Sequence, residues 1–118
     1  NMPWPVSDRD VLNRRQVRQD ERTMVVELTE AATTSATLPI DSRYVRIVRS
    51  RQSWTLTPSR DGTVQVAWVT HTDPNGPIPA SVVNLLSVGA PFESLTTMRN
   101  AIEGGRYQDA SLRYIDEP

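Results

Sequence analysis

The sequence of 118 residues has no cysteine and a single histidine. Without cysteine, the chain can form no disulfide framework and no thiolate metal site, and it has no cysteine nucleophile. His71 has no second base or nucleophile beside it in the sequence, so we interpret it as a surface or turn residue. We also find no phosphate-binding glycine loop and no metal-ligand spacing, and we expect neither a cofactor nor a metal.

An excess of either charge and a long hydrophobic run are missing too. The 13 basic residues are all arginine, and 14 acidic residues bring the net charge to −1. This balance predicts no nucleic-acid partner and no polybasic membrane anchor. Neither a run of about 18 apolar residues nor a basic-then-apolar leader is present, so we expect a soluble, cytoplasmic protein. The length predicts a single domain over residues 1–118.

The most marked pattern that is present predicts one long helix from Pro79 to Glu103. Pro79 suits a first helical turn, and Gly104-Gly105 suits a helix end. Pro91 removes one backbone hydrogen bond and predicts a bend in the middle. Apolar residues recur at steps of three and four between these ends, at Val82, Leu85, Leu86, Val88, Phe92, Leu95, Met98 and Ile102.

The region before the helix predicts an antiparallel sheet of four or five strands, and hence an α+β fold. Residues 9–18 alternate, with Val11, Asn13, Arg15 and Val17 on one face, and residues 23–29 are the expected hairpin partner. Residues 30–42 have no strong period and predict an Ω-loop.

The remaining strands of the predicted sheet lie between this loop and the helix. A strand or bent pair covers residues 44–48 and 53–57, with the bend at 50–52. The Asp61-Gly62 turn then leads into residues 63–71, where Val66 and Trp68 share a face.

Three motifs occur in a specific order over nearly the whole chain. They are Pro3-Trp4-Pro5-Val6-Ser7-Asp8-Arg9-Asp10-Val11, then Asp73-Pro74-Asn75-Gly76-Pro77-Ile78-Pro79 with Val82-Val83-Asn84, then Ala90-Pro91 with Leu95 and Met98-Arg99. Together they resemble the second half of a START (StAR-related lipid-transfer) domain, as in a bacterial-type member of the helix-grip superfamily. The resemblance implies a curved antiparallel sheet wrapped around the C-terminal helix, with a tunnel for one lipid, sterol or other apolar molecule. The family's first helix and strands would precede Trp4.

The resemblance also implies where the site lies. The loop Glu30–Ser42 and the helix would gate the tunnel, and an arginine on the strand after the Trp-Pro motif would point into it. By register this arginine is Arg15, with Asn13 beside it, and its acidic partner would lie in the preceding half of the domain. The residues expected to contact the ligand are Val11, Asn13, Arg15, Val66, Trp68, Leu85, Phe92, Leu95 and Met98.

The residues themselves leave alternatives open. Arg15 either points into the tunnel or faces water, and Trp68 is either core or tunnel wall. We predict a carrier without catalysis, whose partners are an apolar small molecule, a membrane in transient contact, and a second copy through an open sheet edge. One alternative is a polyketide cyclase or aromatase of the same fold, in which Arg15 and His71 would act on the substrate. Another is a module for protein interaction.

Overall fold

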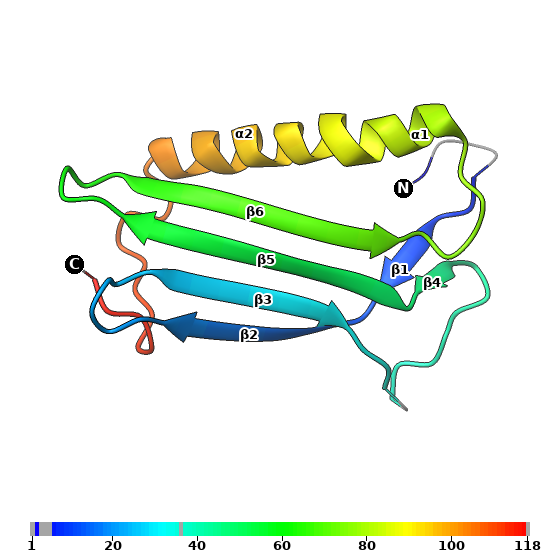
Figure 1. The fold of residues 1–118 in the computed structure, drawn as a ribbon, viewed down its shortest axis with the longest axis horizontal. Coiled ribbons are helices and arrows are strands. Elements are labelled where there is room, and N and C mark those ends of the chain that lie inside the picture. The colour runs from blue at the N-terminus through cyan, green and yellow to red at the C-terminus, as the bar shows by residue number, and fades with distance from the viewer. Residues whose placement is uncertain (1, 3–5, 36, 118) are drawn as a thin grey trace. The chain divides into compact units, whose positions relative to one another are not determined.

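The computed structural model describes residue 2 and residues 6–35 and 37–117, so the motif residues Pro3, Trp4 and Pro5 lie outside the described residues. The chain forms two compact units (Figure 1). One comprises Asn1–Gly76 with Arg113–Pro118, and the other Pro77–Leu112. The first contains the strands and the second contains the helical segments, and each is described by itself.

A four-stranded antiparallel sheet forms the centre of the first unit. Its strands are β2 (Asn13–Gln19), β3 (Val26–Ala32), β5 (Arg49–Pro58) and β6 (Val64–Asp73), in the order β2-β3-β5-β6 (Figure 1). The predicted hairpins are confirmed, since β2 pairs with β3 and β5 pairs with β6. The second hairpin closes at Gly62, whose φ of 84° lies in the left-handed region that glycine tolerates.

A separate two-stranded sheet pairs β1 (Arg9–Val11) with β4 (Val45–Ile47) in parallel. The prediction of one continuous strand over residues 9–18 is therefore wrong. The chain leaves the strand at Leu12, whose carbonyl accepts a 2.8 Å hydrogen bond from the backbone N–H of Thr33. Val11 thus lies in a different sheet from Asn13 and Arg15, with which we had expected it to share a face.

Two further boundaries differ from the predictions. β3 continues to Ala32, so Glu30 is a strand residue and the predicted loop Glu30–Ser42 begins three residues too early. The break between β4 and β5 falls at Val48 and not at residues 50–52. Residues 50–52 stay extended because they pair with Thr72, His71 and Thr70 of β6.

The four-stranded sheet has one largely apolar face and one polar face, because side chains alternate along each strand. Two rows of paired residues cross the apolar face; they are Val17, Leu28, Trp54, Trp68 and Gln19, Val26, Leu56, Val66. Arginine, glutamine, threonine, serine and histidine side chains alternate with them on the polar face. This alternation is typical of an antiparallel sheet that covers something apolar on one side and meets water on the other.

The end of the chain contacts this sheet through an amide side chain. The Gln19 side chain donates to the backbone carbonyl of Asp116 at 2.9 Å and accepts from the backbone N–H of Asp116 at 2.7 Å. The paired bonds imitate one step of a β ladder, and they hold the C-terminal segment at the end of β2.

The second unit contains one continuous helical segment, made of α1 (Ala80–Asn84), η1 (Leu85–Gly89) and α2 (Ala90–Glu103). The Pro79 carbonyl accepts from the N–H groups of Val82 and Val83 at 3.0 and 3.1 Å, which begins the helix where the sequence predicts. Gly105, with φ of 77°, ends it. None of the helices among the described residues has the length and apolarity needed to cross a membrane.

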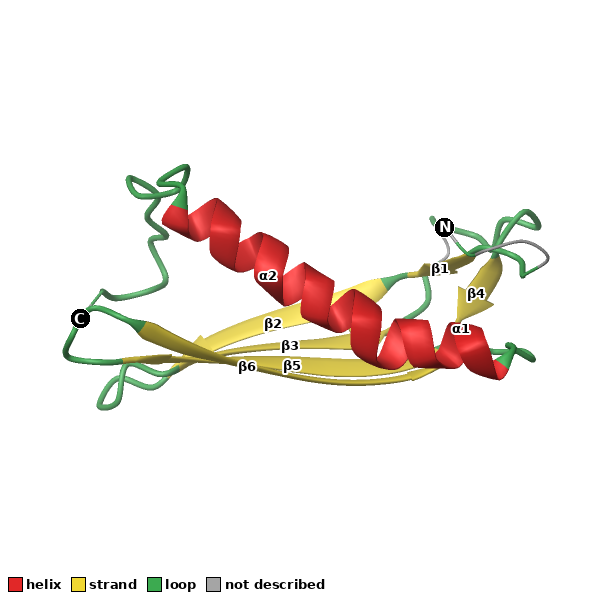
Figure 2. Cartoon of the chain, turned by 90° about the horizontal axis from the view of Figure 1, so that it is seen from above, coloured by secondary structure: helices red, strands yellow, loops and turns green. Residues whose placement is uncertain are grey.

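The predicted irregularity at Pro91 takes the form of a wider helical turn. η1 has π-helical hydrogen bonding and ends at Gly89, two residues before Pro91, which has no N–H to donate to the carbonyl four residues earlier. Figure 2 shows that the helix axis changes direction between α1 and α2. A proline with a neighbouring π-helical segment is a common cause of such a bend.

Candidate ligand-binding face

A buried carboxylate lies at the centre of the apolar face of the sheet. Glu30 on β3 is only 7% exposed. Its cross-strand neighbours are Arg15 on β2 and Gln52 on β5. The carboxylate accepts from Arg15 Nε at 2.5 Å, from Asn13 Nδ2 at 3.5 Å and from the side-chain amide of Gln52. A buried charge is tolerated when it is paired and hydrogen-bonded in this way.

The network continues from the carboxylate to a tryptophan. Gln52 Oε1 accepts a 2.9 Å hydrogen bond from the indole Nε1 of Trp68. The Trp68 ring stacks on Trp54, with the centroids 4.7 Å apart and the planes inclined by 10°. No buried side-chain nitrogen or oxygen among the described residues lacks a partner. We call Asn13, Arg15, Glu30, Gln52 and Trp68 the Glu30 cluster.

Part of the Arg15 guanidinium is available for further hydrogen bonds. Glu30 accepts from its guanidinium, yet the Arg15 side chain is 65% exposed. The nitrogens that do not face Glu30 can therefore donate to a hydroxyl, carbonyl or other oxygen above the sheet. The next row of the same face, which is Val17, Leu28, Trp54 and the cluster residue Trp68, could contact the apolar part of such a molecule.

The acidic partner of Arg15 corrects one expectation. We had expected it to lie in a part of the domain that precedes this chain, whereas the structure pairs Arg15 with Glu30. The sequence does contain the signal, because Val26, Leu28 and Glu30 alternate. Ending the predicted strand at residue 29 and assigning Glu30 to a loop concealed it.

The predicted ligand residues fall into three groups. Asn13, Arg15, Val66 and Trp68 share the apolar face of the four-stranded sheet. Val11 is on β1, in the two-stranded sheet. Leu85 lies in η1, whereas Phe92, Leu95 and Met98 lie on α2. Trp54, Gln52 and Glu30 were absent from the prediction, although they share the face with Trp68 and Arg15.

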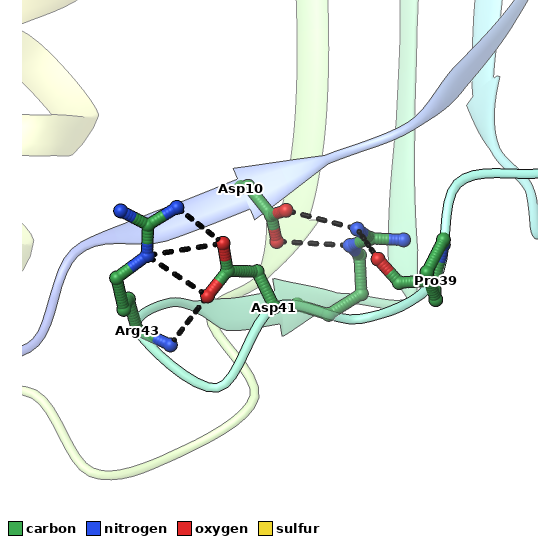
Figure 3. Close-up of polar contacts among 5 residues, drawn as sticks. Asp10, Pro39, Asp41 and Arg43 are labelled. Carbon is green, nitrogen blue, oxygen red and sulfur yellow. Dashed lines mark hydrogen bonds and ion pairs between the residues drawn. The ribbon is translucent and has the colours of Figure 1, made fainter.

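An ion pair joins β1 and β4 beside the root of the loop between β3 and β4. Asp10 Oδ1 and Oδ2 accept from Arg46 Nε and Nη2, both at 2.9 Å (Figure 3). Arg46 is only 10% exposed, and its guanidinium also donates to the carbonyls of Leu38 and Pro39 at 3.4 and 3.3 Å. The Arg46 guanidinium holds the pKa of the Asp10 carboxyl below its usual value. The pair therefore attaches the loop backbone to the small sheet.

The loop has its own local order as well. Asp41 accepts from the backbone N–H of Arg43 at 2.9 Å and from Arg43 Nη2 at 2.7 Å (Figure 3). These bonds hold the pKa of Asp41 below its usual value. The backbone N–H of Tyr44 then donates to the Asp41 carbonyl at 3.0 Å, which closes a turn just before β4.

Two of the sequence motifs meet at this same end of the sheet. Arg9 Nε donates to the Pro74 carbonyl at 3.3 Å, and Asn75 Nδ2 donates to the Arg46 carbonyl at 3.0 Å. Gly76 adopts a φ of 150°, and a Cβ at this position would lie 3.4 Å from Arg9 Nη2. The Asp8–Asp10 and Asp73–Gly76 segments thus form one hydrogen-bonded cluster, which we call the joint.

The order of the strands and helices identifies the fold class of the protein. A curved antiparallel sheet followed by one C-terminal helical segment is the α+β arrangement of the helix-grip fold, which confirms the predicted fold class. The family model that matches is the START domain, over residues 1–103, and the chain belongs to this family. It is also 30% identical over 103 residues to an uncharacterized protein of Pseudomonas aeruginosa. The match covers 87% of this chain and 50% of that protein, so the chain spans about half the length of this relative.

Proposed function

We propose that the protein binds and carries a lipid, sterol or other small hydrophobic molecule without changing it chemically. Membership of the START family supports the binding of a hydrophobic ligand. The observation that carries the proposal is the pairing of an apolar sheet face with one satisfied polar cluster at its centre. Apolar rows give affinity, and a few fixed polar groups orient the ligand.

The apolar surface is sufficient for tight binding without covalent chemistry. Removing roughly 400 Å² of ligand surface from water contributes about 10 kcal/mol at ~25 cal/mol per Å², before the cost of ordering the complex. In this proposal Arg15 donates to the polar end of the ligand, and Trp54 and Trp68 contact its apolar body. As the family fold implies, the C-terminal helix would enclose the ligand and the loop over residues 33–44 would control its entry.

Extraction and mass spectrometry test the proposal directly. We expect native mass spectrometry of the purified protein to show a bound apolar molecule, and solvent extraction to release it unchanged. Recovery of a cyclised or otherwise altered product after incubation with the extracted ligand would instead support the cyclase alternative. A protein that holds no ligand and takes up no fluorescent fatty acid or sterol would contradict both the carrier and the cyclase hypotheses. The remaining hypothesis would then be a module for protein interaction.

A matched pair of variants tests which face binds. Trp68→Ala removes ring surface from the apolar face, whereas Val69→Ala changes the next residue, whose side chain is on the polar face and 68% exposed. We expect Trp68→Ala to weaken binding of a fluorescent sterol at least tenfold and Val69→Ala to leave it unchanged. Equal effects of the two variants would refute the assignment of the face.

We propose further that the protein delivers its ligand by transient membrane contact and that two copies associate through a sheet edge. β2 and β6 are the edges of the four-stranded sheet, and an edge strand offers unpaired backbone groups to another strand. Transfer of a fluorescent lipid between vesicles, faster with protein than without, tests the delivery. Light scattering after size-exclusion chromatography tests the association, and a monomer at all concentrations would refute it.

A further inference from the structure

The polar face of the four-stranded sheet has three basic residues in a single row. Arg14 on β2 pairs with Ala31 on β3, Ala31 pairs with Arg51 on β5, and Arg51 pairs with His71 on β6. All four side chains are exposed. The row therefore crosses the whole width of the sheet, and the small side chain of Ala31 separates the two arginines.

A depression of about 740 Å³ lies over this row. The next row of the polar face supplies its other side chains, which are Gln16, Thr29, Ser53 and Val69. Arg15, Glu30 and Gln52 also line it, but their side-chain polar groups bond to one another in the Glu30 cluster. The depression thus combines two guanidinium groups and an imidazole with one amide and two hydroxyl groups.

Among the residues that the structure describes, no acid forms an ion pair with the arginines of this row. The acids on the polar face are Glu27 and Asp73, and each is paired in register with a different arginine, Arg18 or Arg49. Arg18 donates to Glu27 at 2.6 Å. Within the described part of the chain, Arg14 and Arg51 form no ion pair.

The spacing suits an oxyanion held between the two arginines. Neighbouring strands are about 4.8 Å apart, so Arg14 and Arg51 emerge roughly 10 Å from each other on either side of Ala31. Each side chain is long enough to bring its guanidinium over Ala31, and the planar fork of arginine matches the oxygens of a phosphate group. Hydroxyl and amide groups of the next row can donate to the remaining oxygens.

We propose that the polar face of the sheet is a binding site for a phosphate-type oxyanion, held by Arg14 and Arg51 with His71 at the edge. The site is distinct from the apolar face, on which the proposed carrier function rests. Its ligand is a phosphate ester, either a soluble one or the headgroup of a phospholipid. Because the two faces belong to the same sheet, both ligands could be held at once.

Titration with glycerol phosphate, followed by NMR amide shifts or calorimetry at constant ionic strength, tests the proposal. We expect shifts at Arg14, Ala31, Arg51 and His71, and weakening of at least about tenfold in Arg14→Gln and in Arg51→Gln, since each loses a charge-assisted hydrogen bond. Arg18→Gln is the matched control, because it removes one positive charge from the same face in another row. It should change the affinity less than twofold.

Vesicles of phosphatidylcholine with and without phosphatidic acid distinguish the two sources of the phosphate. Binding to phosphatidic acid vesicles that Arg14→Gln abolishes and Arg18→Gln preserves would assign the site to a headgroup. Binding of glycerol phosphate alone would assign it to a soluble ester. The proposal is overturned if neither probe binds, or if all three arginine substitutions weaken binding equally, because the effect would then be one of net charge.

Discussion

The Glu30→Gln substitution tests whether the Glu30 cluster is a fixed element of the fold. Glutamine has nearly the same shape as glutamate, but it has no charge and places an NH₂ group where one carboxylate oxygen accepts hydrogen bonds. Arg15, Asn13 and Gln52 all donate to that carboxylate. At least one of these donors would then face another donor at a position that is 7% exposed.

The size of the effect follows from the contacts. The Arg15 ion pair is discounted to about 1 kcal/mol, because the Arg15 side chain is 65% exposed and solvent screens it. The bonds from Asn13 and Gln52 contribute about 0.5–1.5 kcal/mol each. We therefore expect Glu30→Gln to lower the free energy of unfolding by roughly 2–4 kcal/mol, a large part of the ~5–15 kcal/mol that holds a typical protein folded.

The same strand offers a matched control in Glu27→Gln. Glu27 also pairs with an arginine of β2, but it is on the polar face and 46% exposed, and its partner Arg18 is 79% exposed. Such a pair contributes about 0–1 kcal/mol. Urea unfolding of the two variants and the parent protein measures the difference. If Glu30→Gln costs no more than Glu27→Gln, the reasoning that buried hydrogen bonds stabilise the cluster is refuted.

Three further substitutions test the loop attachment, the helix and the hairpin. Asp10→Asn should increase proteolysis near Leu38, and equal cleavage of the variant and the parent at pH 7 would refute this role. Because the pKa of Asp10 is lowered, the attachment in the parent should be complete above pH 3.8, the usual pKa of an aspartate, and should be lost as the pH falls through the lowered pKa. Pro91→Ala should raise helix content by circular dichroism, since it restores an N–H, and an unchanged spectrum would mean that the proline does not cause η1. Gly62→Ala should cost about 1 kcal/mol in urea unfolding, since its φ of 84° strains a residue with a Cβ; no change would contradict the turn geometry.

The sequence predicts the fold where local patterns are strong. Pro79 and Gly104-Gly105 mark the helix ends correctly, and Asp61-Gly62 marks the hairpin between β5 and β6. These signals act within a few residues, through fixed φ angles and missing N–H groups, so no distant contact can change them much.

The errors lie where long-range pairing decides. Nothing in residues 9–18 shows that β1 leaves the main sheet, because its partner β4 is more than 30 residues away and the Leu12 carbonyl bonds to Thr33. Likewise, Glu30 is an unfavourable strand residue in isolation. It is extended because β3 is paired on both sides, with Arg15 of β2 and Gln52 of β5 opposite Glu30, and both of these side chains donate to its carboxylate.

The sequence therefore predicts only some of the residues of the candidate ligand-binding face. Asn13, Arg15, Val66 and Trp68 were predicted from alternation and from the family resemblance, and all four lie on the apolar face. Glu30 and Gln52 are missing from that prediction because it assigns Glu30 to a loop and residues 50–52 to a bend, and Trp54 is missing although it falls in the predicted strand over residues 53–57. One strand boundary on β3 and one on β5 thus concealed the centre of the cluster, because a residue assigned to a loop or a bend has no predicted face.

The positions of two of the motifs show how a sequence signal can be specific without lying on the candidate ligand-binding face. At the end of the sheet where β1, β4 and the Asp73–Gly76 turn meet, Arg9 donates to the Pro74 carbonyl and Asn75 donates to the Arg46 carbonyl. The guanidinium of Arg46 donates to the Asp10 carboxylate and to the carbonyls of Leu38 and Pro39. Residues of these two motifs, together with Arg46, therefore fix the base of the loop, whereas in the proposed carrier the apolar rows, which many side chains can supply, would carry the affinity. A change of ligand within this architecture should come from the rows and leave the joint intact.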